Sequence, residues 1–507
     1  MYNQILPMLP LASINELAKS LINVNEKNFA ISVIMQEKDG KTAFTKAELP
    51  AIVEAARAEK VEPYVDNTKE EPMMLKEPKA GKIVSEKPLK QFDAKVLTLS
   101  NGAKVILKKT DLKANEILMM ASAPGGKSIG KKESLAMRKL WTEISSIHGL
   151  GTKSLNDLAN IAQTKMTNIE AGISNDLHYI SGSTVNENVE TLMQMINLSF
   201  TDIKKDENYY KLVTQYMKGK LETKASDPEM VMADSVAYYN HNKQLDALSP
   251  DVKDFDNINY DRALDLYRQL FNNASDFTFT FVGSFDEATI RPLIEKYIAS
   301  IPASKKKAEL VDMRTYTKGK VQKSFSFKMS NPQSKIIDTY RSDKVAYTLE
   351  NQLNARALGQ YLWDKMFEII REKESAVYTP MPSVSLEEDL TGNYITINCE
   401  LATNPEKTEI AEKLAKEIIF DSQTKITNDD IARAKEVLNK KHTEAVKQNN
   451  YWLNVLSDYA TYGVDRANGF DAVMKAMTPQ TVGNIAKMVL KTGNHVQVIM
   501  NAEKLEK

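Results

Sequence analysis

The chain has 507 residues, more than a single hydrophobic core usually serves, so two to four structural units are expected. Its 67 basic residues balance its 67 acidic residues, which gives no electrostatic reason to expect a nucleic acid or a membrane surface as partner. Cys399 is the only cysteine, which excludes an intramolecular disulfide and a multi-cysteine zinc site. With no apolar run near the roughly 20 residues of a membrane helix and no signal-peptide pattern, we expect a soluble protein. The sequence leaves the compartment unknown, with the periplasm and the cytoplasm both open for a longer parent chain.

The first 60 residues predict a fragment of an α+β unit. Residues 13–23 have the capping box and spacing of a helix, and residues 46–60 have the same pattern. The apolar run at 29–35 predicts a strand between them. Residues 61–91 then change character, with four prolines, many charges and little periodicity, which is typical of an extended linker.

A second unit begins at residue 92 with a hairpin around Asn101 and Gly102, the strongest short turn signal in the chain. Apolar alternation predicts its strands at 94–99, 103–108, 116–123, 180–184 and 277–283. Helical spacing predicts helices from 133, from 154, and over 186–224, 229–240, 260–271 and 288–301. This order of strands and helices indicates an α+β unit.

The pattern starts again near residue 318. The predicted strands are 322–328, 377–385, 392–401 and 495–500, and the predicted helices are 347–373, 405–420, 427–447, 451–461 and 478–490. Strict alternation at Ile395, Ile397, Cys399 and Leu401 indicates a half-buried strand.

Internal repeats support this division. Three segments share a helix, a short turn with asparagine and an apolar strand: LASINELAKSLINVNEKNFAISVIMQ, YDRALDLYRQLFNNASDFTFTFVGS and TPQTVGNIAKMVLKTGNHVQVIMNA. A second match joins LETKASDPEMVMADSVAYY to HTEAVKQNNYWLNVLSDYA, and both matches give an offset of roughly 220 residues. The predicted domains are therefore a tail of a preceding homologous domain at 1–60, a linker at 61–91, and two homologous domains at 92–315 and 316–507.

The stretch that carries the candidate chemistry is a predicted amphipathic helix followed by an extended segment. Its buried stripe consists of Leu358, Leu362, Met366, Ile369 and Ile370. Arg371 follows this stripe and stands seven residues before Tyr378. A guanidinium and a phenol at this separation can both donate to one carbonyl oxygen. The plain alternative is an arginine favoured at a helix C-terminus and an ordinary strand tyrosine.

Three motifs in this order resemble the pitrilysin (insulysin and mitochondrial processing peptidase) family of zinc metallopeptidases: LSNGAKVIL, FVGSFDEATIRPLIEKYIASIP and REKESAVY. The resemblance covers nearly the whole chain and implies mixed α/β-sandwich units of the pitrilysin/LuxS-like metallohydrolase type. In that family an N-terminal half carries zinc on His-x-x-Glu-His and a distal glutamate. The C-terminal half binds no metal and contributes an arginine and a tyrosine, which Arg371 and Tyr378 match in type, spacing and context.

The zinc ligands are absent from this chain. The positions of the motif fall on Met137, Leu140 and Trp141, which form an apolar stripe, and the region of the distal glutamate at 216–218 has no carboxylate. Glu222 would need a shifted alignment. The five histidines are His148, His178, His241, His442 and His495, and none begins a zinc motif. We therefore predict no metal bound by this chain, zinc on a partner half, and no activity for this chain alone.

The resemblance implies the C-terminal half of a zinc-dependent metalloendopeptidase, in which Arg371 and Tyr378 bind substrate and stabilise the transition state. The implied partners are a peptide substrate and an N-terminal half with His-x-x-Glu-His, in the same parent chain or as a separate subunit, and a homodimer stays open. The main alternative is a non-catalytic scaffold or partner subunit. A second alternative, a nucleotide-binding loop at GGKSIGKK (125–132), is weakened by Lys132, which stands where magnesium coordination needs serine or threonine.

Overall fold

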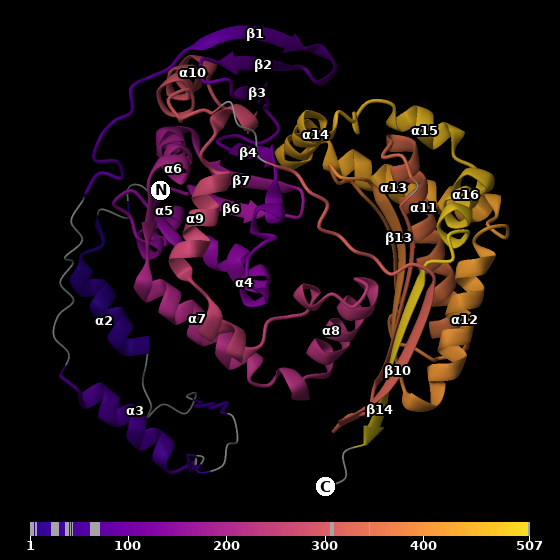
Figure 1. Ribbon diagram of the computed structural model, residues 1–507. Coiled ribbons are helices and arrows are strands. Elements are labelled where there is room, and N and C mark those ends of the chain that lie inside the picture. The colour runs from indigo at the N-terminus through magenta and orange to yellow at the C-terminus, as the bar shows by residue number, and fades with distance from the viewer. Residues whose placement is uncertain are drawn as a thin grey trace. The chain divides into compact units, whose positions relative to one another are not determined.

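The structure is a computed structural model that describes residues 5, 8–21, 30–35, 40, 42, 44–60, 71–304, 309–343 and 345–504. It divides into two compact units, Met1–Glu70 and Glu71–Lys507 (Figure 1). Within the described residues, no helix combines the length and the apolar character that crossing a bilayer requires.

The first unit contains two helices, α2 (Leu11–Leu21) and α3 (Glu48–Ala58). Both the backbone N–H and the hydroxyl of Thr45 donate to the carboxylate of Glu48 at 2.7 Å, which fixes the start of α3. The strand predicted at 29–35 is wrong for residues 30–35, which are not a strand, and Phe29 lies outside the described residues. A strand exists only when it is paired, and the described part of this unit offers no other strand as a partner.

The second unit begins with a seven-stranded sheet in the order β1-β2-β3-β9-β4-β7-β6. Its strands are β1 (Ile83–Leu89), β2 (Ala94–Leu99), β3 (Lys104–Lys109), β4 (Ile117–Pro124), β6 (Asn168–Ile173), β7 (Leu177–Thr184) and β9 (Thr278–Gly283). The β3–β9 pair is parallel, and the other pairs are antiparallel. The hairpin predicted around Asn101 and Gly102 is the β2–β3 connection.

A five-stranded sheet follows in the order β10-β14-β11-β13-β12. Its strands are β10 (Lys320–Met329), β11 (Ser334–Ser342), β12 (Met381–Glu387), β13 (Tyr394–Thr403) and β14 (His495–Lys504). Only the β10–β14 pair is parallel among its described pairs. This pattern repeats β3-β9-β4-β7-β6 strand for strand, so the two sheets share one topology. We call the part of the unit from β1 to α10 (Glu287–Leu293) the first domain and the part from β10 to β14 the second domain.

Helices complete both domains. Those of the first are α4 (Leu135–Ser145), α5 (Leu155–Thr164), α6 (Val189–Thr201), α7 (Glu207–Leu221), α8 (Pro228–Asn240), α9 (Tyr260–Leu270) and α10 (Glu287–Leu293). Those of the second are α11 (Leu349–Met366), α12 (Thr408–Asp421), α13 (Asn428–Ala445), α14 (Asn449–Tyr462), α15 (Phe470–Ala476) and α16 (Pro479–Leu490). A π turn follows α10 at Ile294–Ile298 and α11 at Phe367–Lys373, and β5 (His148–Leu150) pairs with β8 (Ile203–Lys205).

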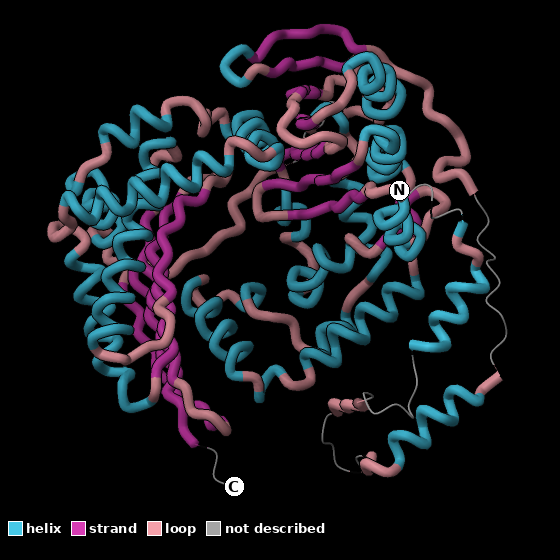
Figure 2. The backbone as a smooth tube through the Cα atoms, turned by 180° about the vertical axis from the view of Figure 1, so that it is seen from behind, coloured by secondary structure: helices cyan, strands magenta, loops and turns pink. Residues whose placement is uncertain are grey.

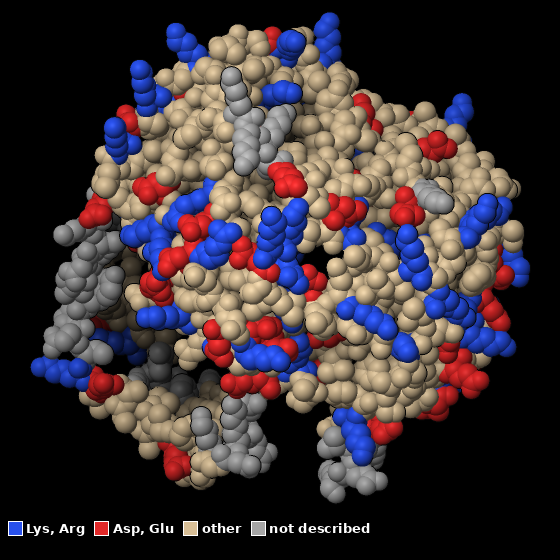
Figure 3. Space-filling view, in the orientation of Figure 1, with Lys and Arg blue, Asp and Glu red and all other residues tan. Residues whose placement is uncertain are grey.

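Each sheet carries its main core on one face, as the alternation of side chains requires. In β3, Val105 and Leu107 face a core formed with α4, α6, α9 and α10, whereas Ile106 faces the opposite side. In the second domain the corresponding core lies between the sheet and α11, α12, α13 and α16. Figure 2 shows these helices on one side of the five-stranded sheet. On the face shown in Figure 3, basic and acidic side chains are interspersed, in keeping with the balanced charge.

The two domains exchange one helix each across their remaining sheet faces. From the second domain, α14 packs Leu453 and Leu456 against Ile106 and Val282 of the first sheet. From the first domain, α8 packs Met232 against Val498 and its neighbours on the second sheet. These two helices are the segments joined by the second sequence repeat, so the exchange is reciprocal, and Figure 1 shows each helix beside the other domain's sheet.

The sequence analysis missed several features of this fold, among them the strands β5 and β6 and the helix α15. Residues 83–89, within the predicted linker, form the edge strand β1. The predicted helix over 186–224 is divided into α6 and α7, with β8 between them. The strand β11 was not predicted because buried polar side chains interrupt its apolar alternation: Asp338 is fully buried, and its carboxylate lies 2.6 Å from Nε2 of His495.

Candidate functional site

The predicted amphipathic helix is α11 with its following π turn. Thr348 caps it by accepting a hydrogen bond from the backbone of Asn351 at 3.1 Å. The predicted stripe faces the second core: Leu358, Leu362, Met366 and Ile370 are fully buried, and Ile369 is partly buried. Because this stripe is anchored along the whole helix, the position of the residue that follows it is fixed by packing.

A left-handed turn then redirects the chain. Ser375 has a φ of 50°, and its backbone N–H and that of Ala376 bond to the carbonyls of Arg371 and Ile370 at 3.0 and 2.9 Å. Val377 is buried and bridges to β13, so the side chain of the next residue, Tyr378, points outward and is 82% exposed. The turn therefore brings Tyr378 back over the end of the helix.

The guanidinium of Arg371 lies between two aromatic rings. Its central carbon is 4.3 Å from the ring centroid of Phe367 and 5.2 Å from that of Tyr378. Such cation–π contacts orient a guanidinium while leaving its N–H groups free to donate. Among the described residues, no carboxylate forms an ion pair with Arg371. The structure thus brings the two predicted site residues together at an exposed position, and their role stays a prediction.

The sequence analysis did not identify Phe367 as a contact of Arg371, although the spacing of the two residues indicates it. Phe367 precedes Arg371 by four positions, and Trp363 precedes Phe367 by four, so all three share one face of the helix. The Trp363 and Phe367 rings stack with centroids 4.9 Å apart. An aromatic residue four positions before an arginine is the sequence pattern that predicts such stacked side chains on one helix face.

On α4 the positions of the zinc motif are part of the core. Met137, Leu140 and Trp141 are 3%, 1% and 1% exposed, and all three belong to the main core of the first domain. A thioether, an isobutyl group and a buried indole do not fit Zn²⁺, which needs nitrogen, oxygen or thiolate ligands. Around the expected distal ligand, Tyr216 is exposed and Lys218 pairs with Asp256 at 3.1 Å.

The histidines and carboxylates of the described ranges form no other candidate metal site, since no group of three or more His, Cys, Asp or Glu side chains there has the required arrangement. His178 is fully buried among aromatic rings, and burial lowers its pKa to about 3, while the carbonyl of Leu270 opposes this in part. His148 is also buried, and burial lowers its pKa to about 4.

Backbone N–H groups of the glycine-rich loop after β4 are already hydrogen-bonded within the protein. The backbone N–H groups of Gly125 and Lys127 both bond, at 2.8 Å, to carbonyls of the β6–β7 turn, on Asp176 and Ser174. A phosphate-binding loop needs such N–H groups free to point at the phosphate. The loop therefore fits a structural turn against the neighbouring hairpin and not a nucleotide site.

Comparisons with known proteins agree with this architecture. Residues 257–438 match the family model described as "Peptidase M16 inactive domain". The chain is 20% identical over 465 residues to a "Zinc protease PQQL-like" of Arabidopsis thaliana, with 88% of this chain and 46% of that protein covered. It is 21% identical over 442 residues to the "Probable zinc protease PqqL" of Haemophilus influenzae, with 83% and 45% covered. The chain thus spans about half the length of the curated relatives it matches.

Solved structures show the same fold. The periplasmic protease PqqL from Escherichia coli is similar with a TM-score of 0.74 and 20% identity, over 91% of this chain and 51% of that chain. A peptidase M16 inactive domain from Pseudomonas fluorescens has a TM-score of 0.64 and 14% identity, over 82% of this chain and all of that one. The resemblance stated from the sequence motifs is confirmed: residues 257–438 match the inactive domain of M16 peptidases, and the relatives with which the chain aligns are PqqL-like zinc proteases.

Proposed function

We propose that this chain is the C-terminal, non-metal-binding half of a zinc-dependent metalloendopeptidase, and that Arg371 and Tyr378 bind the substrate and its transition state. The zinc belongs to a partner half that bears His-x-x-Glu-His, in the same parent chain or as a separate subunit. The observation that carries the proposal is the guanidinium of Arg371, held 5.2 Å from the exposed ring of Tyr378 with no carboxylate paired to it in the described structure.

The chemistry of this pair is donation to an oxygen that gains negative charge. When a peptide carbonyl is attacked, its oxygen becomes an oxyanion, and donors aimed at that oxygen stabilise the transition state more than the substrate. Arg371 brings a cation with several N–H donors, and Tyr378 brings a neutral O–H donor. Because Arg371 forms no ion pair in the described structure, no competing contact has to break before it donates to the oxyanion.

The domain organisation belongs to the same proposal. Residues 1–60 would be the tail of a preceding homologous domain, residues 61–91 the connection, and the two sheet-bearing domains the C-terminal half. The exposed apolar side chains of α2 support this: Leu11, Leu17 and Leu21 are 72%, 60% and 73% exposed. Apolar faces of this kind normally pack against a core.

The proposal is tested by mixing the chain with a purified half that contains His-x-x-Glu-His and measuring cleavage of a fluorogenic peptide. Cleavage is expected only in the mixture, and Arg371→Ala should lower kcat/KM about 100-fold, the cost of one lost oxyanion donor. Lys373→Ala is the matched control, because this lysine lies in the same π turn and pairs with Glu368 at 2.7 Å. Full activity of the Arg371→Ala mixture would overturn the assignment.

A scaffold role is the second candidate. The burial of Met137, Leu140 and Trp141, which stand at the positions of the zinc motif, is as compatible with a scaffold as with catalytic assistance. The two functions separate in the same experiment. Association of the two halves without cleavage indicates a scaffold, whereas cleavage that depends on Arg371 indicates catalytic assistance.

A further inference from the structure

A cleft of about 620 Å³ opens beside the first half of α11. Its walls come from α11, β12, α13 and α14, and from the segment that precedes α15. Leu353, Val384, Leu438 and Val455 form an apolar lining on several sides. A cleft of this size and lining can enclose several atoms of a ligand and not merely a surface ion.

The charged side chains that line this cleft carry one sign. They are Arg356, Lys441 and Arg466, together with the titratable His442, and no aspartate or glutamate is among its described lining residues. This differs from the outer face of Figure 3, where both signs are interspersed. We call this feature the cationic cleft. A low-dielectric cleft lined with one sign of charge concentrates ligands of the opposite sign.

Arg356 and Gln352 offer the cationic cleft donors that have no partner among the described residues. Arg356 is exposed, and no ion pair or hydrogen bond within the described part of the chain engages its guanidinium. Gln352 is 6% exposed, yet its Nε2 is buried without a hydrogen-bond partner. The two terminal nitrogens of Arg466 are held by Asp458 and by the hydroxyl of Tyr347 at 3.1 Å, while its buried Nε has no hydrogen-bond partner. A buried amide without a partner is costly, so an acceptor that fills the cleft would relieve it.

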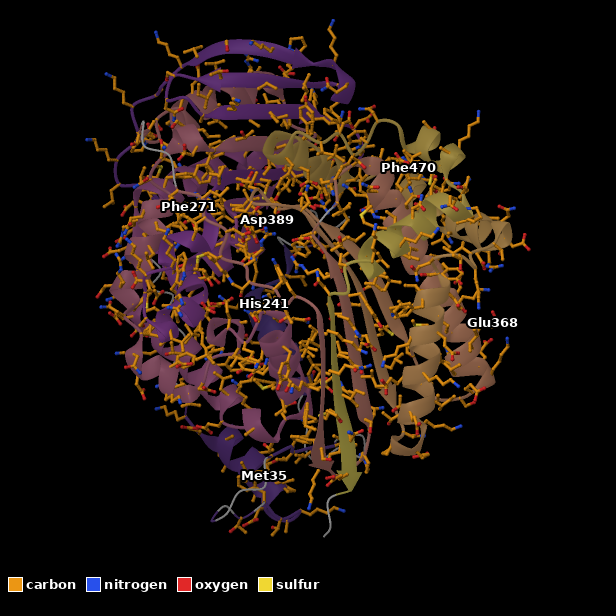
Figure 4. The ribbon with its side chains drawn as sticks, turned by 45° about the vertical axis from the view of Figure 1, so that its right-hand side comes forward. Met35, His241, Phe271, Glu368, Asp389 and Phe470 are labelled. Atoms are coloured by element: carbon orange, nitrogen blue, oxygen red, sulfur yellow. The ribbon has the colours of Figure 1, made fainter. Side chains whose placement is uncertain are left out.

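The cationic cleft and the Arg371–Tyr378 pair share one face of a single helix. The side chains Gln352, Arg356, Trp363, Phe367 and Arg371 follow at helical spacing, and Trp363 both lines the cleft and stacks on Phe367. From Arg356 to Arg371 the helix rises about 22 Å. An extended peptide covers that distance in about seven residues. Figure 4 shows Phe470, in the cleft wall, and Glu368, beside Arg371, on the same helical side of the second sheet.

We propose that the cationic cleft binds carboxylates of the peptide substrate, with Arg356 and Gln352 as the donors and Lys441 and Arg466 as the surrounding charges. That the ligand is a peptide rests on the proposed function, whereas the preference for a carboxylate rests on the cleft alone. The carboxylate comes from an acidic side chain or from the peptide C-terminus. The cleft would thus select acidic peptides and hold them along α11, several residues away from the bond that is cleaved.

Isothermal titration calorimetry on the full chain tests this without any cleavage. The probes are an octapeptide of alternating leucine and glutamate with an amidated C-terminus, its glutamine counterpart with a free C-terminus, and the amidated glutamine peptide. Binding of the first probe assigns the side-chain carboxylate, and binding of the second assigns the terminal one. The fully neutral peptide should not bind. Equal binding of all three, or binding of none, overturns the proposal, and so does inorganic phosphate that binds more tightly than either acidic peptide.

Variants then assign the binding to the cleft. Arg356→Gln and Lys441→Gln should each weaken acidic-peptide binding at least tenfold. Lys440→Gln should leave it unchanged, because this exposed lysine is the neighbour of Lys441 on α13 but does not line the cleft. Unaltered binding in Arg356→Gln overturns the proposal. Arg371→Ala should retain acidic-peptide binding. Loss of binding therefore tests the cationic cleft, whereas loss of cleavage tests the proposed catalytic role of Arg371.

Discussion

Helices α4 and α11 occupy the same place in two homologous domains, yet they are used in opposite ways. Each follows a strand that pairs antiparallel with a member of the parallel pair of its sheet, β4 with β9 and β11 with β14. On α4 the positions that would face a ligand, Met137 and Trp141, are buried in the core. On α11 one face is equally buried, but the other presents Trp363 at 41% exposure and the partly exposed Arg371.

The two helices differ in what they leave accessible: α4 buries the positions of the zinc motif, whereas α11 leaves one face open to solvent. Once apolar side chains fill the ligand positions of α4, the helix gains packing energy and has no polar group left to offer a metal. The opposite face of α11, which carries Trp363 and ends at Arg371, contributes little to the core, so its side chains remain accessible to a ligand. Stability and function are therefore expected to separate between these two helices.

The largest expected effect is on folding, from Trp141→Ala. This side chain is 1% exposed in the main core of the first domain, and its removal should cost about 3–5 kcal/mol of unfolding free energy. Trp363→Ala on α11 is the matched control and should cost about 1 kcal/mol, since it loses mainly a stack on Phe367. Urea unfolding followed by circular dichroism measures both. Equal losses would contradict the contrast between the two helices.

The next largest expected effect is a loss of stability when α14 or α8 is weakened where it packs on the other domain's sheet. Leu456→Ala removes a fully buried side chain of α14 and should cost about 2–5 kcal/mol. Because Leu456 belongs to the second domain but packs on the first sheet, hydrogen exchange should speed up in β9. Met232→Ala on α8 should do the same in β14. Unchanged protection of β9 in Leu456→Ala would show that the domains do not support one another.

A smaller effect depends on pH and concerns the first domain. Burial lowers the pKa of His178 to about 3, below the ordinary value of about 6.5 in an unfolded chain. The unfolded state therefore binds the proton first, and this contribution to stability is full above pH 6.5 and declines as the pH falls toward 3. The slope reaches about 1.4 kcal/mol per pH unit. His178→Leu should flatten the pH dependence of urea unfolding, and an unchanged slope would count against this origin.

The sequence predicted much of the fold because strong local patterns coincide with it. The β2–β3 hairpin, the amphipathic α11 and both repeats follow from turn chemistry and periodicity. The elements that it missed depend on tertiary partners. β1 is a strand only because β2 pairs with it. In β11 the apolar alternation is interrupted by Asp338, which is buried because it contacts His495. Likewise Arg371 and Tyr378 were singled out through the family resemblance, which they match in type and spacing, but the cationic cleft was not foreseen. Its side chains lie between Leu349 and Phe470 in the sequence, and only folding brings these distant segments together.

The central claim is that the pair at the end of α11 acts on a carbonyl oxygen held by a partner half. Tyr378→Phe tests it most directly, because the ring remains beside Arg371 while only the hydroxyl donor is lost. In the assembled halves, single-turnover kinetics should show a kcat about 100-fold lower with KM and the association of the halves unchanged. A kcat equal to that of the unaltered chain would contradict the account.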